Sequence, residues 1–375
     1  MKVAIITITD VNYGNRLQNY ALYKFLEQLS FQPENLIIQD LRKKTLINKT
    51  KSVLRKRVKK IIPAPLLRRN YIAKKISQEK SDIVLKEKAH IFSVFTERYM
   101  KSKTVTLYQE KDKRKHINQD EYGFFFAGSD QIWNPDFAGD DYFFLDFAEP
   151  QKRIAFAASI GYETLDEDIL VQYVKYWKDM QYISVREESA AKMIEQSTGK
   201  KVEIFLDPTM LLTQAEWKEI SEKPKFEIPR KYILCFFLGN IPEKTIKEYQ
   251  REYGIEVIML NDKAYTDYYL AGPSIFLYLI EHAALVLTDS FHCTVFSIIF
   301  HKDFFVFERE QKDLKNMFTR LNGLLNKMGF QERIIRRNDV SVNEEIQEYR
   351  FIEAARIMSA EQQRVTQIIT ALCER

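Results

Sequence analysis

The sequence predicts an α/β protein of about two domains. The first observation is its length of 375 residues, which corresponds to about two domains. The second is that short apolar runs alternate with segments of helical periodicity along most of the chain. With 45% hydrophobic residues, including 26 Phe and 20 Tyr, the chain has enough apolar side chains to fill two cores.

Charge and cysteine content limit the class of function. The 57 basic residues exceed the 52 acidic ones by 5, an excess too small to indicate nucleic-acid binding. Cys235, Cys293 and Cys373 are widely spaced and form no CxxC pair, so we expect neither disulfides nor a cysteine zinc site. Residues 1–10 are typical of a strand rather than a signal peptide, and no stretch reaches the length of a membrane span. We therefore expect a cytoplasmic protein.

The first βα unit carries a polar loop. A buried strand over 3–9 is expected to lead through the loop 10–16 into a helix over 17–29. Only Gly14 is present where a GxGxxG fingerprint needs three glycines, so this loop does not predict a dinucleotide site. Asn12 and Asn15 are candidates for contact with a ligand. The alternative is that they only accommodate the turn.

Residues 41–78, which follow a short strand at 36–39, are the least balanced in charge. They contain many lysines and arginines and no acidic residue, and their apolar residues recur at nearly helical spacing. This pattern predicts a basic amphipathic helix that ends at Pro63 and Pro65. Such a helix can lie on an anionic bilayer, each basic residue near the surface contributing about 1 kcal/mol. The alternative is a solvated helix on its own domain.

After a helix over 80–99 and a polar connection, residues 123–137 combine a strand with a polar turn. The strand is expected at 124–127, and Asp130, Gln131 and Trp133 follow it. Carboxylates and amides bond sugar hydroxyls while an aromatic ring stacks on the sugar, so these three side chains are candidates for sugar binding. Alternatively, Trp133 is a core residue with its N–H bonded.

Two further strands, at 154–159 and 183–187, precede helices. Between them, Asp166-Glu167-Asp168 spells a DxD triplet, but acidic residues suit a helix start, so we expect a helix to about 178 and no metal. Arg186 falls at the carboxyl end of the second strand, where a guanidinium can grip a carboxylate or phosphate with two bonds. The alternative is a structural ion pair with Glu187 or Asp207.

The second half of the chain repeats the α/β pattern. A strand at 202–205 ends the first series, and the polar stretch 206–229 is interpreted as inter-domain. The helix over 351–373 is long enough to return to the first domain. The predicted units are 1–210, 225–345 and 351–375. Strands are expected near 232–237, 256–260, 284–287 and 304–307, with a helix opening at 272–274.

The turn at 288–293 offers the clearest candidate for chemistry. Ser290 is a good N-cap, which places Phe291 and His292 in the first turn of a helix, where backbone N–H groups lack acceptors and the dipole is positive. His292 therefore stands beside an anion-binding position at the carboxyl end of a strand. Simple packing or capping is the alternative. Cys293 points about 100° away on the helix and is expected to be a buried thiol.

Five segments together resemble the polysaccharide pyruvyl transferase family. In chain order they are Tyr13-Gly14-Asn15, residues 128–135 (GSDQIWNP), Val185-Arg186-Glu187, Leu206-Asp207-Pro208-Thr209 and residues 288–292 (TDSFH). The resemblance spans about residues 1–307. It implies a fold like that of GT-B glycosyltransferases, with two Rossmann-like domains facing a cleft. It also implies transfer of the enolpyruvyl unit of phosphoenolpyruvate to two sugar hydroxyls, giving a cyclic pyruvate ketal and phosphate.

The resemblance also implies roles for individual residues. His292 would be the general acid, and Arg186 would hold the donor together with Ser290 and Phe291. Asn12, Asn15, Asp130, Gln131 and Trp133 are the candidates for the acceptor site. Phosphoenolpyruvate serves as co-substrate, and no cofactor, metal or nucleic acid is expected. The acceptor is a sugar or a lipid-linked oligosaccharide, and segment 41–78 is the candidate for contact with the inner face of an anionic membrane.

One position departs from the family pattern. Characterised members tend to carry Arg-Leu-His where this chain has Ser290-Phe291-His292, so a donor-binding arginine is missing at that turn. Either helix N–H groups with Ser290 and a distant lysine or arginine replace it, or the donor differs. A GT-B glycosyltransferase that uses a nucleotide sugar is one alternative function. The other is a non-catalytic protein that binds a glycan or an anionic lipid.

Overall fold

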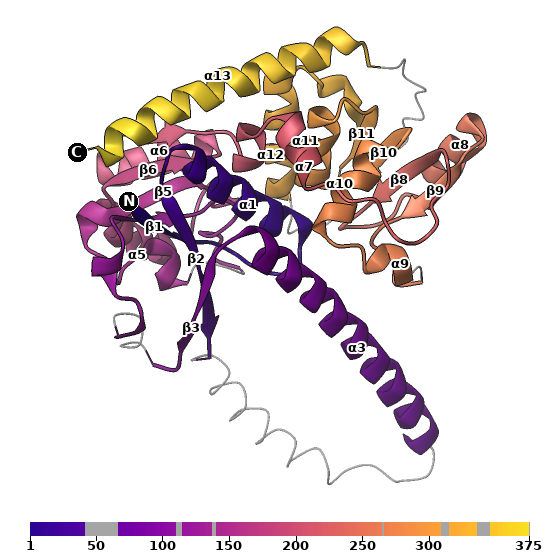
Figure 1. The fold of residues 1–375 in the computed structure, drawn as a ribbon, viewed down its shortest axis with the longest axis horizontal. Helices are drawn as coiled ribbons and strands as arrows, with labels where there is room; N and C mark the ends of the chain where they lie inside the picture. The colour runs from indigo at the N-terminus through magenta and orange to yellow at the C-terminus, as the bar shows by residue number, and fades with distance from the viewer. Residues whose placement is uncertain are drawn as a thin grey trace.

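The protein is described by a computed structural model that covers residues 1–41, 67–109, 115–136, 140–264, 266–308, 315–335 and 346–374. Its backbone forms two parallel sheets with helices on their faces (Figure 1). This confirms the predicted α/β class with two Rossmann-like domains. We refer to the halves that contain the first and second sheet as the first and second domain.

The first sheet has seven strands in the order β3-β2-β1-β4-β5-β6-β7, and every neighbouring pair is parallel. Its strands are β1 (Lys2–Ile6), β2 (Gln32–Asp40), β3 (Ser102–Leu107), β4 (Phe124–Ala127), β5 (Arg153–Ala158), β6 (Tyr182–Val185) and β7 (Glu203–Ile204). Central strands such as β5 are buried along their whole length, as expected of a sheet covered on both faces. The strand order reverses between β1 and β4, which marks the usual ligand position of such a sheet.

The second sheet has five parallel strands in the order β12-β11-β10-β8-β9. Its strands are β8 (Tyr232–Phe236), β9 (Glu256–Met259), β10 (Leu285–Thr288), β11 (Phe304–Phe307) and β12 (Ile334–Ile335). Here the strand order reverses between β8 and β10. The predicted turn at 288–293 therefore follows a strand at the reversal point.

Helices cover both sheets. The α-helices are α1 (Tyr13–Gln28), α3 (Leu67–Tyr99), α5 (Glu167–Lys178), α6 (Glu188–Thr198), α7 (Gln214–Glu219), α8 (Glu243–Tyr253), α9 (Thr266–Tyr269), α10 (Pro273–Glu281), α11 (Phe291–Ile299), α12 (Lys315–Met328) and α13 (Glu348–Cys373). Short 3-10 turns are η1 (Gln119–Glu121), η2 (Asp141–Phe144), η3 (Pro150–Lys152), η4 (Pro208–Leu211) and η6 (Gln331–Arg333).

The first helix starts earlier than predicted. The side chain of Asn12 accepts hydrogen bonds from the backbone N–H groups of Gly14 and Asn15, at 2.8 and 3.3 Å, and so caps α1 at Tyr13. Gly14 and Asn15 therefore lie in the first helical turn rather than in a loop. Reading the Asn/Gly pair as a turn signal missed this cap.

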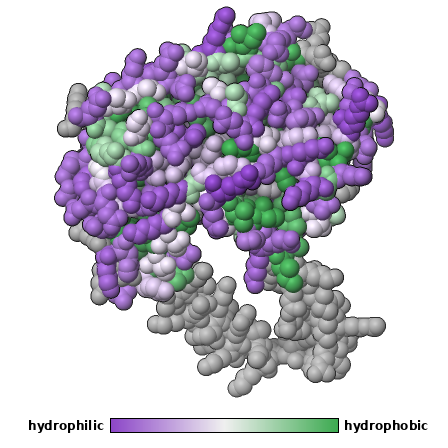
Figure 2. All heavy atoms as spheres, in the orientation of Figure 1, coloured by the Kyte–Doolittle hydropathy of each residue, from purple (hydrophilic) through white to green (hydrophobic). Residues whose placement is uncertain are grey.

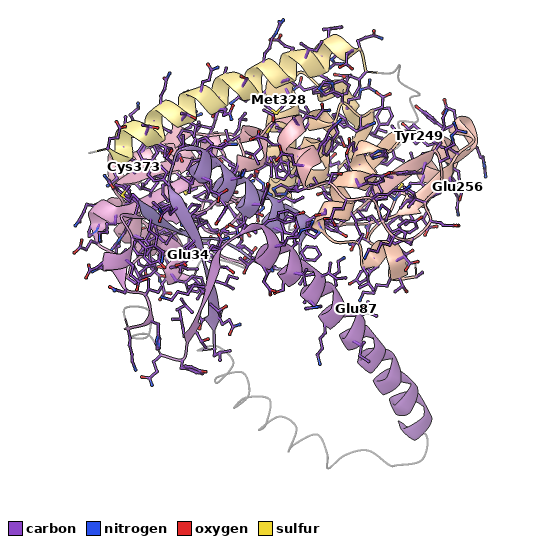
Figure 3. The ribbon with its side chains drawn as sticks, in the orientation of Figure 1. Glu34, Glu87, Tyr249, Glu256, Met328 and Cys373 are labelled. Atoms are coloured by element: carbon purple, nitrogen blue, oxygen red, sulfur yellow. The ribbon has the colours of Figure 1, made fainter. Side chains whose placement is uncertain are left out.

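Two further elements of the first domain differ from the prediction. Strand β3 lies in the stretch predicted to be a polar connection, because SKTVTL is an edge strand that buries only part of one face. Helix α3 begins at Leu67 instead of 80 and projects from the body of the protein, with Glu87 labelled on it in Figure 3. Residues 42–66 lie outside the described residues, so the amphipathic helix predicted within 41–78 stays a prediction.

The two domains meet through apolar contacts. Tyr13 on α1 stacks on Phe276 of α10, with ring centroids 4.3 Å apart. Trp217, within the stretch 206–229 predicted as inter-domain, packs edge-on against Phe296 of α11 and also contacts the ring of Tyr20 of α1. One apolar cluster therefore runs from the first sheet to the second.

Helix α13 lies against both domains (Figure 1). Near its middle, Glu361 accepts a hydrogen bond from the backbone N–H of Leu206 at 3.1 Å, and Arg364 donates to the carbonyl of Ile204 at 2.5 Å. Figure 3 labels Met328 at the end of α12 below this helix and Cys373 at its far end. The helix joins the end of the first sheet to the second domain.

The face shown in Figure 2 is largely hydrophilic, with small apolar patches. Among the helices of the described residues, none combines the length and apolar character that a membrane span requires.

Candidate active site

The polar residues singled out in the sequence converge where strands of the two sheets end. Asp130 follows β4, Arg186 follows β6 and Asp207 follows β7, all in the first domain. His292 follows β10 in the second domain and lies on the first turn of α11, whose N-cap is Ser290 as predicted. Because parallel strands present their carboxyl ends at one edge, this is the edge at which α/β proteins bind ligands.

Asp207 joins the imidazole to the guanidinium. Its Oδ2 accepts a hydrogen bond from Nη1 of Arg186 and lies 3.4 Å from Nε2 of His292. Its Oδ1 accepts from the backbone and hydroxyl of Thr209, at 3.0 and 2.7 Å. Burial opposes ionisation of this carboxyl, but the charges of Arg186 and His292 outweigh burial and hold its pKa below the ordinary value. His292 and Arg186 thus lie against the same carboxylate oxygen.

Asp130 is held on the other side of Arg186. Its Oδ1 lies 3.2 Å from Nη2 of Arg186, and its Oδ2 accepts from Nδ2 of Asn15 at 2.5 Å. The backbone of Asp130 has a φ of 70°, a left-handed conformation seldom seen outside glycine. Burial raises the pKa of Asp130, and the positive charges around it more than reverse this effect. Arg186 therefore forms the ion pair with Asp207 that is the alternative to a ligand-binding role. It forms a second ion pair with Asp130.

Gly14 leaves the space that the His292 ring occupies. A Cβ atom built at Gly14 would lie 2.0 Å from Nδ1 of His292, far closer than any real contact. The ring is thus enclosed between helix α1 of the first domain and Asp207. No sequence pattern predicted this reason for a glycine at position 14.

We expect Gly14→Ala to displace the His292 ring. Alanine is the better helix former, so α1 itself tolerates the change and the damage falls on the imidazole. A ring misplaced by about 1 Å would lower turnover roughly 100-fold. Turnover measured beside the thermal unfolding midpoint tests this. Gly323→Ala, in the exposed part of α12 with no atom within 4 Å of the new Cβ, is the matched control. Normal turnover of Gly14→Ala would contradict the placement of His292 at the reacting centre.

A second buried guanidinium, which the sequence did not reveal, lies beside Arg186. Arg320 of α12 donates from Nη1 to Oγ of Ser159 at 3.2 Å, and its Nε is 4.0 Å from Oε1 of Glu187. With its amide oxygen turned toward Arg320, Gln131 accepts from the guanidinium at 2.5 and 3.2 Å. Arg320 belongs to no motif and lies beyond the stretch of family resemblance, so nothing local marked it.

The ring of Phe291 is close to both guanidiniums. The Cζ atoms of Arg186 and Arg320 are 5.3 and 5.7 Å from the centre of its ring. Cys293, the next residue but one, is fully buried, and burial raises the pKa of its thiol to about 12. Phe291 thus faces the charged cluster, whereas Cys293 is an inert thiol as expected.

The predicted acceptor residues divide into two groups. Asp130, Asn15 and Gln131 belong to the charged cluster described above. The prediction that Trp133 stacks on a sugar is wrong. Its side chain has no exposed surface, its Nε1 donates to the carbonyl of Phe143 at 3.3 Å, and its ring stacks on Phe144. It is a core residue and presents no face to a sugar. Asn12 caps α1 with its side-chain oxygen, so that atom is already engaged.

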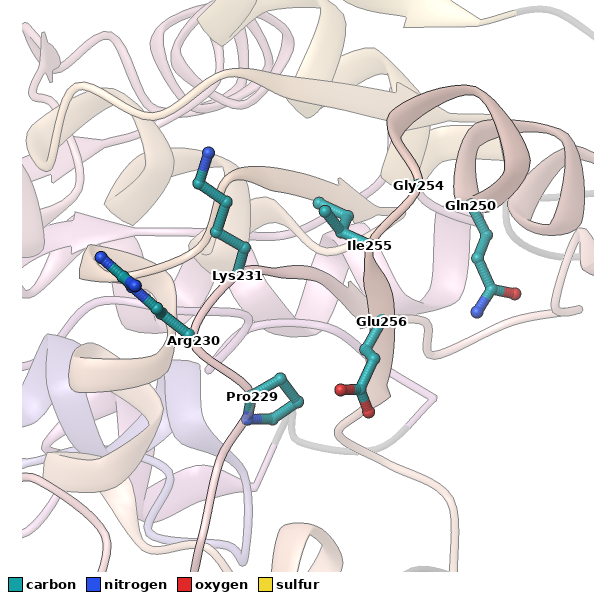
Figure 4. A pocket seen from close by; sticks show the side chains of 7 residues that line it. All are labelled: Pro229, Arg230, Lys231, Gln250, Gly254, Ile255 and Glu256. Carbon is teal, nitrogen blue, oxygen red and sulfur yellow. The ribbon is translucent and has the colours of Figure 1, made fainter.

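A surface depression lies elsewhere. It has a volume of about 510 Å³ and is lined by Lys231, Glu256 and neighbouring residues (Figure 4). Lys231 and Glu256 stand at the amino ends of β8 and β9. Because ligands of parallel sheets bind at the opposite edge, we place the active site at the charged cluster and not in this depression.

The cluster has the groups for acid–base chemistry on an anion. It contains one imidazole, two guanidiniums and three carboxylates, and these side chains are nearly buried. Within the described residues, no group of three metal-binding side chains is found. Asp166 and Asp168 of the DxD triplet stand at the N-terminus of α5.

The two parallel sheets and the site between them define a two-domain Rossmann-like protein of the GT-B type. The solved structure of UDP-GlcNAc 2-epimerase from Methanocaldococcus jannaschii matches with a TM-score of 0.52 and 12% identity, over 99% of this chain and 100% of that chain. A putative UDP-N-acetylglucosamine 2-epimerase from Listeria monocytogenes has a TM-score of 0.49 and 10% identity, over 98% and 95%. Identities this low show the fold alone.

The family follows from the sequence. The family model for polysaccharide pyruvyl transferase matches residues 12–311, which is most of the chain, and the protein belongs to this family. It is therefore a transferase of polysaccharide biosynthesis. A comparison with curated proteins gives no match. Arg320 lies outside the matched residues, which explains why the family pattern did not point to it.

Proposed function

We propose that the protein transfers the enolpyruvyl unit of phosphoenolpyruvate to two hydroxyls of a sugar in a surface-polysaccharide precursor. The products are a cyclic pyruvate ketal and phosphate. The observation that supports this proposal is the meeting of His292 and Arg186 on the carboxylate of Asp207, at the carboxyl ends of strands from both domains. An acid and a cation side by side suit a small donor that carries both a carboxylate and a phosphate.

In the proposed reaction, protonated His292 gives its proton to the methylene carbon of the donor. The first sugar hydroxyl attacks the resulting cation at C2, and phosphate then leaves. The second hydroxyl closes the ketal. Of the two hydroxyl protons released, one returns to His292 and one leaves with phosphate. Such a positioned acid is typically worth about 10²–10⁴ in rate.

Two neighbours assist the imidazole. Asp207, 3.4 Å from Nε2, holds the ring in one orientation. Arg186 balances the charge of the donor and of the departing phosphate. The guanidinium is itself shared between Asp207 and Asp130, so its position is set before a donor arrives.

A nucleotide sugar is the second candidate donor. UDP-GlcNAc is bound in the solved Neisseria meningitidis epimerase, which has 11% identity to this chain over 99% of it and 100% of that chain, with a TM-score of 0.47. In this protein, the backbone N–H groups of Leu238 and Gly239 at the end of β8 both donate to Asp289, each at 2.8 Å. Because a carboxylate already takes these donors, a diphosphate is disfavoured there.

Binding experiments separate the candidates. We expect phosphoenolpyruvate to raise the midpoint of thermal unfolding, since a ligand at 100 times its Kd contributes about 2.7 kcal/mol. A panel of nucleotide sugars run in parallel should leave the midpoint unchanged. Phosphate release with α-linked and β-linked hexosides then identifies the acceptor. Stabilisation by nucleotide sugars alone would replace the proposed donor, and stabilisation by glycans alone would favour a non-catalytic binding protein.

The acceptor proposed here is lipid-linked, at the inner face of the membrane. The basic residues of 41–78 provide the attraction to anionic lipid. Helix α3 continues from this segment and carries the exposed side chains of Ile83 and Leu85. Attraction of this basic segment to the membrane would hold the enzyme close to its substrate.

A further inference from the structure

We infer that Arg320 is the second arginine of the donor site and that it binds the phosphate group. This assignment rests on the proposed function for the identity of the donor. The family pattern has an arginine at the position of Ser290, in the turn after β10. In this chain, Arg320 on α12 supplies a guanidinium instead.

The geometry places Arg320 in the same site as Arg186. Both guanidiniums lie over Phe291, with Cζ 5.3 and 5.7 Å from the ring centre. Phe291 directly precedes His292, so the proposed acid is next to the residue that both arginines contact. The first turn of α11 starts at Phe291 and adds the positive end of the helix dipole.

The charges of the two guanidiniums are compensated to different degrees. Burial and then the like charge of Arg186 lower the pKa of Arg320 to about 10, and the neighbouring carboxylates only partly offset them. Burial also opposes the charge of Arg186, but Asp207 and Asp130 overcome that effect and raise its pKa. Arg320 is therefore the less compensated of the two cations. A phosphate, as the more highly charged end of the donor, relieves the repulsion between them.

Arg320 reaches its site from the opposite domain. Helix α12 belongs to the second domain, whereas Ser159, Glu187 and Gln131 follow strands of the first. Arg186 is also a residue of the first domain. A phosphate bound by both arginines therefore contacts both domains. Donor binding then strengthens the contact between the domains.

The presence of serine rather than arginine at position 290 agrees with a phosphate-binding role for Arg320. The hydroxyl of Ser290 caps α11 and its carbonyl accepts from Thr294, so this residue is used to form the helix start. Its short side chain adds no charge. The phosphate-binding charge then has to come from another element, and α12 delivers one.

Direct binding measurements test the assignment. Calorimetry with inorganic phosphate and with phosphoenolpyruvate is carried out on wild type, Arg320→Gln and Arg320→Lys. A hydrogen bond to a charged group is worth about 1.5–3 kcal/mol, so we expect Arg320→Gln to weaken binding of both ligands roughly 10-fold to 100-fold. Arg320→Lys keeps the positive charge, so it should bind both ligands more tightly than Arg320→Gln does. It should not reach the affinity of wild type, because lysine lacks the bidentate geometry of arginine. The affinity for pyruvate, which lacks phosphate, should differ little between wild type and Arg320→Gln.

Arg333→Gln is the matched control. Arg333 is also a largely buried arginine of the second domain, and its guanidinium lies 5.3 Å from the ring centre of Phe305. It should bind both ligands as wild type does. Equal affinity of Arg320→Gln and wild type would overturn the assignment, as would an equal loss in Arg333→Gln.

The outcomes also separate this inference from the proposed function. If wild type binds phosphoenolpyruvate and Arg320→Gln binds it equally well, the role of Arg320 is wrong and the donor stands. If inorganic phosphate binds through Arg320 but phosphoenolpyruvate binds no better, the phosphate site stands and the donor is wrong. Binding of neither ligand to wild type would reject both.

Discussion

His292→Gln should lower turnover by about 10²–10⁴ while the protein still folds and binds its donor. Glutamine fills a similar volume and can turn its amide N–H toward Asp207, but it does not deliver a proton to carbon. The loss therefore reports the chemical step. The measurement is phosphate release from phosphoenolpyruvate in the presence of a reactive sugar acceptor, with donor affinity determined separately.

The control for this variant is a histidine outside the site. His282 caps the end of α10 and stacks on Tyr278 at the surface. His282→Gln should turn over as wild type does. If His292→Gln retained most of the phosphate release, His292 would not be the acid and the proposed mechanism would be wrong.

Asp207→Asn should lower the free energy of unfolding by about 3–5 kcal/mol at pH 7. The substitution removes the negative charge of Asp207, which faces both Arg186 and His292. It can also place an amide N–H against the N–H groups of those two side chains. Breaking one partner of a buried ion pair leaves the other charge uncompensated, which is why the loss is large. Urea unfolding of both proteins measures it.

The same variant should show a specific dependence on pH. The pKa of Asp207 in the folded protein lies below its ordinary value of 3.8. Its ionised form therefore contributes stability that is fully present above pH 3.8 and is lost as the pH falls through the lower folded value. The difference between wild type and Asp207→Asn should shrink as the pH falls below about 4.

An ion pair with an exposed carboxylate provides the comparison. Asp179 lies 3.8 Å from Arg153, and its side chain is 61% exposed. Asp179→Asn should cost no more than about 1 kcal/mol, because water screens such a pair. If Asp207→Asn cost equally little, the carboxylate would not hold the cluster together.

The strands and their ends were largely predictable. The runs at 124–127 and 304–307 are short, apolar and bounded by polar turns, and they became β4 and β11 with the predicted bounds. Because ligands of parallel sheets gather at the carboxyl ends, Asp130, Arg186 and His292 were predicted as site residues from local pattern alone. The structure brings all three together, although their catalytic and binding roles stay predictions.

Two of the errors have different physical causes. Trp133 follows a strand end as a sugar-stacking residue would, but Phe143 and Phe144 enclose it. Such a case needs the packing of a second segment to be known. The start of α1 was missed for a different reason: the cap at Asn12 is local, to the N–H groups of Gly14 and Asn15, but the Asn/Gly pair was interpreted as a turn.

The amino-acid sequence by itself determined the alternation of strands and helices, the N-cap at Ser290 and the position of each polar residue at the end of its strand. These features depend on periodicity and on hydrogen bonds across a few residues. Only the tertiary structure decided which charges meet: Asp207 between Arg186 and His292, Gly14 against the imidazole, and Arg320 beside Phe291. Those contacts depend on strand order and on the docking of two domains, which no local pattern encodes.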